Sequence, residues 1–556
     1  MRNTAAILWL SSAFFVTPLA FCRLTGEKVP LFGLVSAVTL PVLAVTALAL
    51  TLVCMDFRVY KRDFRWRLLG CAQAAVAAVS LWHCCNGVPW ESFLLTMFWV
   101  LAPTVGVALK DELEKMLGIF ALLWTVLLIF SGINSEHFTG FIGNWNWTQA
   151  MLAAMLPGCF LLFKIKKWQY WSLVALAIVF VFIYLKYPEQ LSRSMLVAIP
   201  VTLAVLLIQE KWRLLPWLRK FHPAWAVGVA ALGLILFIEF ADFNSSRLQL
   251  WKGTIDLLLS HGIGGVGMGQ YAGEILPFLP EKYYFTPFAA PWHPHPHNEL
   301  LNFVCAYGIA GLLYIWALIY MVLSLPPRND WETFARWVFL ILLTGGMFDM
   351  SCAVLPGALW CFCCAGISGG RYRPARIVNI PGVIPGVLLL ALAAIMIRAN
   401  VASTTARRNG ELALSRSDVH TARKFLQQSS EVEAQYLLAE LELMVFKSPE
   451  RAERVLAGMK NDYLHTSRLR ALVHYLAKDY EKALTEMKRE CRNYPYSVIN
   501  AHWYYRMLQA SQAPLPDIRE AEQIFAGVCA LRGITPAQAG SFTSKADDSP
   551  LKYPAE

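Results

Sequence analysis

The sequence predicts an all-α membrane protein with about 12–13 transmembrane helices and a helical domain at its C-terminal end. Hydrophobic residues make up 57% of the 556 residues and charged residues only 16%, whereas a soluble domain is about one quarter charged. Apolar runs of roughly 18 or more residues, long enough to cross a bilayer as a helix, recur through residues 1–399. Beyond them the composition changes to Ala, Glu, Lys, Arg and Leu with a helical period.

The apolar runs are separated by short connectors, and each run is predicted to be one span. The first is expected to be uncleaved, because Phe21 is too large for the position before Cys22 and no A-x-A pattern is present. The predicted spans are 5–21, 31–55, 68–85, 92–109, 116–133, 148–163, 170–186, 194–208, 223–241, 300–325, 336–350, 352–369 and 380–398.

The connectors predict the sidedness of the chain. Basic residues gather after every even-numbered span, as in 58–67 and 164–167, and basic connectors stay in the cytoplasm. The net charge of +11 is therefore explained by topology rather than by nucleic-acid binding. The N-terminus is expected inside and the loop 242–299 outside. Residues 336–369 could form one long span or two short ones. Two are needed to keep the basic residues at 371–376 inside, whereas a single span would move the C-terminal domain to the cytoplasm.

The C-terminal region predicts an array of helix pairs. The segment 472–484 resembles half of a tetratricopeptide (TPR) unit, with Ala483 where helices cross and Pro495 ending the next helix. Residues 436–457 read as a second pair. We expect a TPR-like periplasmic domain at 400–540 and disorder at 541–556. Cys491 and Cys529 could form a disulfide if this domain is exported.

The most unusual local feature is a histidine string before the tenth predicted span. His293, His295 and His297 are separated by prolines in a chain with only 11 histidines. Histidine takes up a proton near neutral pH, and prolines keep the backbone extended. Alternating prolines favour a polyproline helix, which would splay the three imidazoles around its axis and hold a metal ion poorly. A base placed at a membrane surface is the favoured interpretation.

Other polar residues border the predicted outer surface. Arg193 opens the eighth span and Arg247 follows the ninth; each could instead be an ordinary snorkelling or exposed charge. The glycine run 262–269 lacks the βαβ context of a nucleotide loop, so nucleotide binding is excluded. Asp349 is a weaker candidate at the turn between spans eleven and twelve. The cysteines at 361, 363 and 364 lie inside an apolar run and are expected to act as small hydrophobes.

Taken in order, these motifs resemble the O-antigen ligase and polymerase (Wzy/WaaL-like) superfamily over residues 140–400. The motifs are Ser-Arg-Ser at 192–194, Arg-x-x-x-Trp at 247–251, Gly-x-Gly-x-Gly at 265–269, His-Asn-x-x-Leu at 297–301 and Gly-x-x-Gly at 308–311. Asn146, in the Asn-Trp-Asn-Trp stretch 144–147, resembles that family's outer loop. The large helical domain after the last span is similar to the PglL/PilO-type protein O-oligosaccharyltransferases.

The resemblance implies a GT-C-like glycosyltransferase domain at 1–399 that needs no cofactor and no metal. The donor would be a glycan on undecaprenyl diphosphate, and the acceptor a Ser or Thr hydroxyl of an exported protein such as a pilin. His297 would be the base, and Arg193 and Arg247 would hold the diphosphate, with inversion at the sugar. Alternatives are an O-antigen ligase or glycan polymerase with the same donor, and a glycan transporter or flippase. The supporting residues would be His293, His295, Asn298, Glu299, Asn146 and Asp349.

Overall fold

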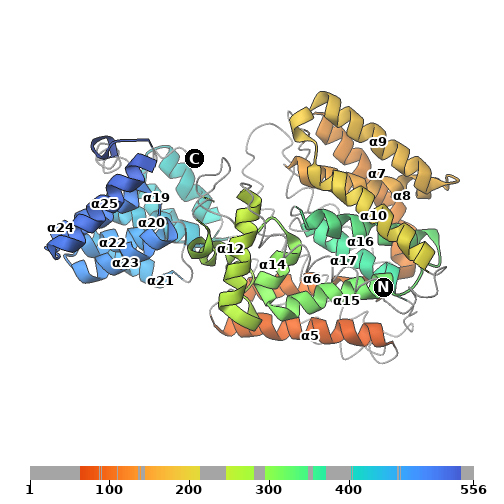
Figure 1. Ribbon diagram of the computed structural model, residues 1–556, viewed down its shortest axis with the longest axis horizontal. Helices are drawn as coiled ribbons and strands as arrows, with labels where there is room; N and C mark the ends of the chain where they lie inside the picture. Colours follow the sequence, from red (N-terminus) through yellow and green to blue (C-terminus); the bar gives the residue numbers. More distant parts are fainter. Residues whose placement is uncertain are drawn as a thin grey trace. The chain divides into compact units, whose positions relative to one another are not determined.

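The computed structural model describes residues 63–134, 144–212, 246–283, 295–348, 355–370 and 402–539, with a few short gaps, and Phe138 (Figure 1). Every regular element in these ranges is helical, as the predicted all-α class requires. The predicted spans 5–21, 31–55, 223–241 and 380–398 and the predicted disordered end 541–556 lie outside the described residues.

The chain divides into two compact units. The first unit draws on residues 1–242, 254–270 and 295–398, and the second on 243–253, 271–294 and 399–556. The predicted outer loop 242–299 is therefore shared between the two units. The helices of the first unit are α5 (Phe64–Cys85), α6 (Trp90–Ala108), α7 (Lys110–Ile133), α8 (Trp145–Leu162), α9 (Trp168–Lys186), α10 (Arg193–Trp212), α14 (Glu299–Tyr307), α15 (Ile309–Leu323), α16 (Asp330–Gly346) and α17 (Leu355–Gly369).

Among the described residues of the first unit, three helical segments are long and apolar enough to cross a membrane: Phe64–Cys85, Met116–Ile133 and Trp168–Lys186. Shorter apolar segments lie at Trp99–Ala108, Arg193–Leu206 and Ile309–Leu323. Exposed apolar side chains such as Ile178 and Leu185 on α9 match a helix that faces lipid. The chain is a membrane protein, and the full count of 12–13 spans stays a prediction.

Small residues allow the helices of the first unit to pack closely. A Cβ at Gly106 of α6 would overlap the Cys363 carbonyl of α17, and one at Gly366 of α17 would overlap the Pro103 carbonyl of α6. Such close backbone approach is typical of helices packed within membranes. Cys361, Cys363 and Cys364 are fully buried in the same core, so they pack as small apolar side chains.

The predicted pair of spans within 336–369 appears as two helices, α16 and α17, packed on one another. The predicted span 300–325, in contrast, is broken. Gly308 has φ 58° and ψ −139° and separates α14 from α15, as Figure 1 shows. The single uninterrupted helix expected there is wrong.

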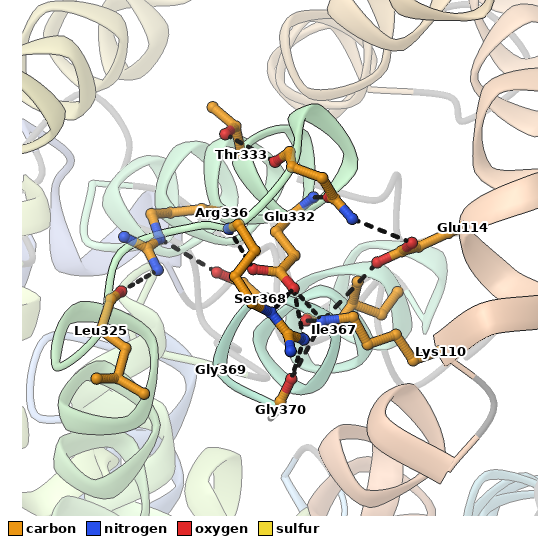
Figure 2. A network of polar contacts seen from close by, with 12 residues as sticks. Lys110, Glu114, Leu325, Glu332, Thr333, Arg336, Ile367, Ser368, Gly369 and Gly370 are labelled. Atoms are coloured by element: carbon orange, nitrogen blue, oxygen red, sulfur yellow. Dashed lines mark hydrogen bonds and ion pairs between the residues drawn. The ribbon is translucent and has the colours of Figure 1, made fainter. Parts of the chain in front are cut away.

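Charged residues from several connectors meet at one end of the first unit, which we call the basic end (Figure 2). Lys110 Nζ contacts Glu332 Oε1 at 2.5 Å and the carbonyl oxygens of Ile367 at 2.8 Å and Gly370 at 3.1 Å. Arg328 Nε donates to Glu332 Oε1 at 2.9 Å. Positive side chains thus meet the carbonyl end of α17, where the helix dipole is negative.

Two buried arginines extend the basic end. Arg336 donates to Ser368 Oγ at 3.1 Å and to the Leu325 carbonyl at 2.6 Å. Arg65 donates to Ser324 Oγ at 3.4 Å. Residues from the connectors after predicted spans two, four, ten and twelve therefore share one side, as the charge pattern requires. Which side of the membrane this is stays a prediction.

The second unit contains the C-terminal helices α19 (Val419–Leu426), α20 (Val432–Met444), α21 (Pro449–Gly458), α22 (Thr466–Leu476), α23 (Tyr480–Asn493), α24 (Val498–Ala510) and α25 (Leu515–Leu531). From α19 to α25 each helix packs on its neighbour in the chain. The predicted pair 436–457 corresponds to α20 and α21, Ala483 is fully buried at a helix crossing, and α23 ends before Pro495. The helical array is present, while its TPR-like character stays a prediction.

The disulfide considered for the C-terminal region does not form. Cys491 and Cys529 are both free. Cys529 packs with Phe525 and Ala501, whereas Cys491 packs against a separate cluster around Met487 and Met507. Burial raises the pKa of the Cys491 thiol to about 12, so this side chain acts as a small apolar group.

Candidate functional site

The candidate site begins at the first turn of α14, where the histidine string ends. The side chain of Asn298 accepts a hydrogen bond from the Leu301 amide at 3.0 Å, so Asn298 is the N-cap of the helix. Its Nδ2 donates to the Met347 carbonyl at 2.7 Å, just beyond α16. One buried amide therefore starts α14 and ties it to the end of α16.

The two described histidines of the string lie together. The ring centroids of His295 and His297 are 4.7 Å apart at an angle of 79°. His297 has φ 53°, in the left-handed region. The expectation that the prolines would splay these two imidazoles is therefore wrong, because the left-handed turn at His297 departs from the polyproline conformation. His293 lies outside the described residues.

Glu299 is buried in the first turn of α14. Its Cγ lies so close to Gly346 that a Cβ added there would be 2.7 Å away. Only glycine therefore fits at this point of α16. Because α16 rises about 21 Å between Glu332 and Gly346, the start of α14 lies at the end of the first unit opposite the basic end, which we call the far end.

The glycine run packs against the break between α14 and α15. Val266 N donates to the Cys305 carbonyl at 2.7 Å and Gly267 N to the Ala306 carbonyl at 3.2 Å. Both carbonyls belong to the last turn of α14, which lacks partners within its own helix. Gly265, Gly267 and Gly269 all have positive φ. The run therefore caps a helix by its backbone, which explains its glycines without a nucleotide.

Arg193 opens α10 at the far end. The buried Gln149 side chain of α8 donates to the Gln190 carbonyl at 2.7 Å and accepts from the Ser192 amide at 2.9 Å. The Arg193 side chain is exposed. Helices α8 and α10 both pack on α16. Near the end of α8, a Cβ at Gly158 would meet Phe334 close to the start of α16, so the start of α8, and with it the start of α10, lies at the far end.

The remaining predicted residues are less constrained. Asn146 is half-buried in the first turn of α8, where its amide donates to Asn144 Oδ1 at 2.9 Å. Arg247 is exposed in the first turn of α12 (Ser246–His261) and belongs to the second unit. Trp251, one turn further on, is buried. Asp349 lies outside the described residues.

Two positioning side chains escaped sequence reasoning. Gln149 is a single polar residue in an apolar run. Its position just after the Asn-Trp-Asn-Trp stretch could have indicated that it lies near the site. His83 ends α5, and its Nε2 lies 3.0 Å from the Gly264 carbonyl. Nothing in the local sequence of His83 indicates the glycine run as its partner, because the two segments are distant along the chain.

The far end thus combines an imidazole pair fixed by a capped helix with an exposed guanidinium at the start of another helix. An imidazole can accept a proton, and a guanidinium can bind phosphate oxygens in a bidentate manner. Such a combination is suited to a reaction in which a hydroxyl loses a proton and a phosphate group departs.

Residues 189–316 match the family model of the O-antigen ligase domain, Wzy_C. This segment, which we call the ligase-like segment, is similar to O-antigen ligases. No curated protein matches the chain, and no solved structure matches it either. The ligase-like segment contains Arg193, Arg247, the glycine run and His297, and it ends within α15. The match supports the O-antigen ligase superfamily, a glycan-transfer function, a lipid-linked glycan donor and a membrane environment.

Proposed function

We propose that this protein is an O-oligosaccharyltransferase that moves a glycan from undecaprenyl diphosphate to Ser or Thr hydroxyls of exported proteins such as pilins. The observation that carries the proposal is His297, held at the capped start of α14 within the ligase-like segment. The same segment contains the two arginines. The active site and the C-terminal array would face the periplasm from the bacterial inner membrane.

The donor chemistry explains the arginines. A lipid diphosphate is a good leaving group without protonation, but negative charge develops on its bridging oxygen as the glycosidic bond breaks. Guanidinium groups stabilise such charge through paired hydrogen bonds. Arg193 and Arg247 are proposed for this role, and both residues are exposed.

The acceptor chemistry explains the histidine. A Ser or Thr hydroxyl is a weak nucleophile and reacts faster when a base removes its proton. His297 is proposed as that base, with His295 beside it and Asn298 and Glu299 fixing the helix start. Attack opposite the departing diphosphate inverts the anomeric carbon in one displacement. Neither step requires a metal ion.

The helical array favours a protein acceptor over the runner-up readings. Stacked helix pairs present extended surfaces that bind polypeptide. A ligase that acts on a lipid A core sugar does not need a polypeptide-binding surface. An O-antigen ligase or a glycan polymerase remains the alternative with the same donor. A transporter or flippase fits less well, because charges in such proteins concentrate near the bilayer midplane.

The test is co-expression with a lipid-linked glycan and a candidate pilin, followed by mass spectrometry of the pilin and of lipid A. We expect the glycan mass on a Ser or Thr of the pilin. A glycan found only on the lipid A core would instead identify a ligase, and elongation of the lipid-linked glycan would identify a polymerase.

Variants assign the residues in the same experiment. His297→Ala, Arg193→Ala and Arg247→Ala should each abolish transfer while the protein still inserts into the membrane. The matched control for the arginines is Arg67→Ala, an exposed arginine in the first turn of α5 near the basic end, which should retain transfer. Continued transfer by His297→Ala would remove the base assignment. A reporter fused after Arg398 would test whether the array is periplasmic.

A further inference from the structure

The turn that joins α12 to the glycine run exposes large apolar side chains. Leu259, in the last turn of α12, is 77% exposed, and Ile263, in the short helix η5 (Gly262–Gly264), is 76% exposed. Two neighbours are also exposed, Trp82 at 56% and Ile309 at 53%. If this turn were surrounded by water, these residues would form an unfavourable exposed apolar patch.

The height of this turn can be measured from the basic end. Helices α5 and α15 run side by side (Figure 1), and Arg65 Nη1 lies 3.4 Å from Ser324 Oγ at their shared end. Charged side chains avoid the hydrocarbon region, so this level marks one of its edges. From Arg65 to His83, α5 rises about 27 Å, and from Ser324 back to Gly308, α15 rises about 24 Å.

The turn is attached to both helices at these heights. The Gly264 carbonyl lies 3.0 Å from His83 Nε2, and Gly308 lies so close to the Ile263 carbonyl that a Cβ would overlap it. The hydrocarbon core of a bilayer is about 30 Å thick. The heights measured along α5 and along α15 are both smaller than this thickness. Both measurements therefore place the turn within the hydrocarbon core, near its opposite edge.

Irregular backbone is tolerated at that depth only where its polar groups are paired. The amides of Val266 and Gly267 donate to the last carbonyls of α14 at 2.7 and 3.2 Å. The Gly264 carbonyl is paired with His83, as above. The glycine run thus provides hydrogen-bond partners both for its own backbone amides and for the last carbonyls of α14.

The polar side chains at the turn are also paired within the protein. Ser260 Oγ donates to the Leu257 carbonyl at 2.8 Å. His261 Nδ1 lies 3.0 Å from Ser260 Oγ and 3.1 Å from the Leu257 carbonyl. Both side chains fold back onto the end of α12, so the apolar Leu259 and Ile263 are left pointing outward.

We propose that residues 257–265 form a membrane-inserted turn whose exposed side chains, Leu259 and Ile263, contact the acyl chains of bilayer lipids. The occupant of this surface is the bilayer itself, because the depth of the turn, its apolar exposure and its paired polar groups all match that environment. The segment from α12 to the glycine run is then anchored in the membrane instead of extending freely into water.

The test is spin-label accessibility in the full chain, reconstituted in bilayers after replacement of its thirteen cysteines. A nitroxide at Ile263→Cys should collide more often with oxygen, which partitions into lipid, than with a water-soluble nickel chelate. Ile178→Cys on α9 is the lipid-facing control, and Leu515→Cys on α25 is the water-exposed control. A label at 263 that behaves like the label at 515 would overturn the proposal.

A second measurement needs no cysteine replacement. Ile263→Lys should lower the midpoint of thermal unfolding in bilayers by about 5 °C or more, because a charge is moved into hydrocarbon. Ile263→Leu should leave the midpoint unchanged, as should Leu515→Lys. An Ile263→Lys protein as stable as Ile263→Leu would show that the turn lies in water.

Discussion

Asn298 offers the sharpest test of how the site is held, because its side-chain oxygen and its side-chain nitrogen make different hydrogen bonds. The side-chain oxygen caps α14 through the Leu301 amide, and the nitrogen donates to the Met347 carbonyl. Asn298→Ser keeps a capping oxygen but loses the donor. Asn298→Ala loses both interactions. The two variants therefore separate the start of α14 from its attachment to α16.

The expected losses follow from the two interactions. Removal of an N-cap costs about 1 kcal/mol, and loss of a hydrogen bond to a buried carbonyl costs about 1 kcal/mol more. If that energy holds His297 in its working position, Asn298→Ala should lower kcat roughly 30-fold, since each 1.4 kcal/mol is about a factor of ten. Asn298→Ser should fall between this variant and the wild type.

The assay is glycan transfer by the purified chain in lipid nanodiscs, with kcat and KM measured separately. A positioning role, in which Asn298 acts through His297 rather than on a substrate, predicts a lower kcat with little change in KM. Asn329→Ala is the matched control, since Asn329 caps α16 through the Glu332 amide at the basic end; it should lose stability but keep kcat. Equal kcat values for wild type, Ser and Ala at position 298 would refute the reasoning.

Three further outcomes concern stability. Gly308→Ala should destabilise the protein by more than about 2 kcal/mol, because φ is 58° there and a Cβ would overlap the Ile263 carbonyl. Glu332→Ala should cost about 3–5 kcal/mol, because it removes the carboxylate 2.5 Å from the buried Lys110 and leaves the lysine only the more distant Glu114, at 3.8 Å, among its described ion pairs. Burial raises the pKa of Glu440 in α20 to about 7, so the stability its proton provides is present below about pH 4.5 and is lost as the pH rises through 7. Glu440→Gln should therefore stabilise the C-terminal array by up to about 3 kcal/mol at pH 8 and hardly at all at pH 4.

Each of these three outcomes has its own check by thermal unfolding. Gly273→Ala, where a Cβ meets nothing within 4 Å, is the control for Gly308, and equal midpoints would contradict the close approach to Ile263. Glu450→Ala removes an exposed carboxylate and should be neutral; the same result for Glu332→Ala would contradict the ion cluster. A pH-independent effect of Glu440→Gln would contradict the raised pKa.

The parts of the site that depend on neighbouring residues were predictable from sequence. The capping role of Asn298 is predictable, because an asparagine before an apolar run is a common helix start. The shared side of the basic connectors was also predictable, since topology follows the distribution of Lys and Arg. Both predictions rest on local pattern alone.

The parts that depend on distant contacts were not predictable. The break at Gly308 exists because the carbonyl of Ile263 occupies the space beside it, and no pattern within 300–325 contains that information. Arg336 opens a predicted span next to a connector, yet it is fully buried and donates to Ser368 and the Leu325 carbonyl. The pairing of His295 with His297 depends on a left-handed φ that the prolines alone did not indicate.

The most direct test of the central claim is transfer of a labelled glycan in vitro. The purified chain in nanodiscs would be supplied with an undecaprenyl-diphosphate-linked glycan and an acceptor pilin, and the pilin mass would be followed over time. We predict that the wild-type protein adds the glycan to a Ser or Thr, and that His297→Ala adds none while remaining folded. A His297→Ala protein that transfers glycan at the wild-type rate would contradict the proposed site.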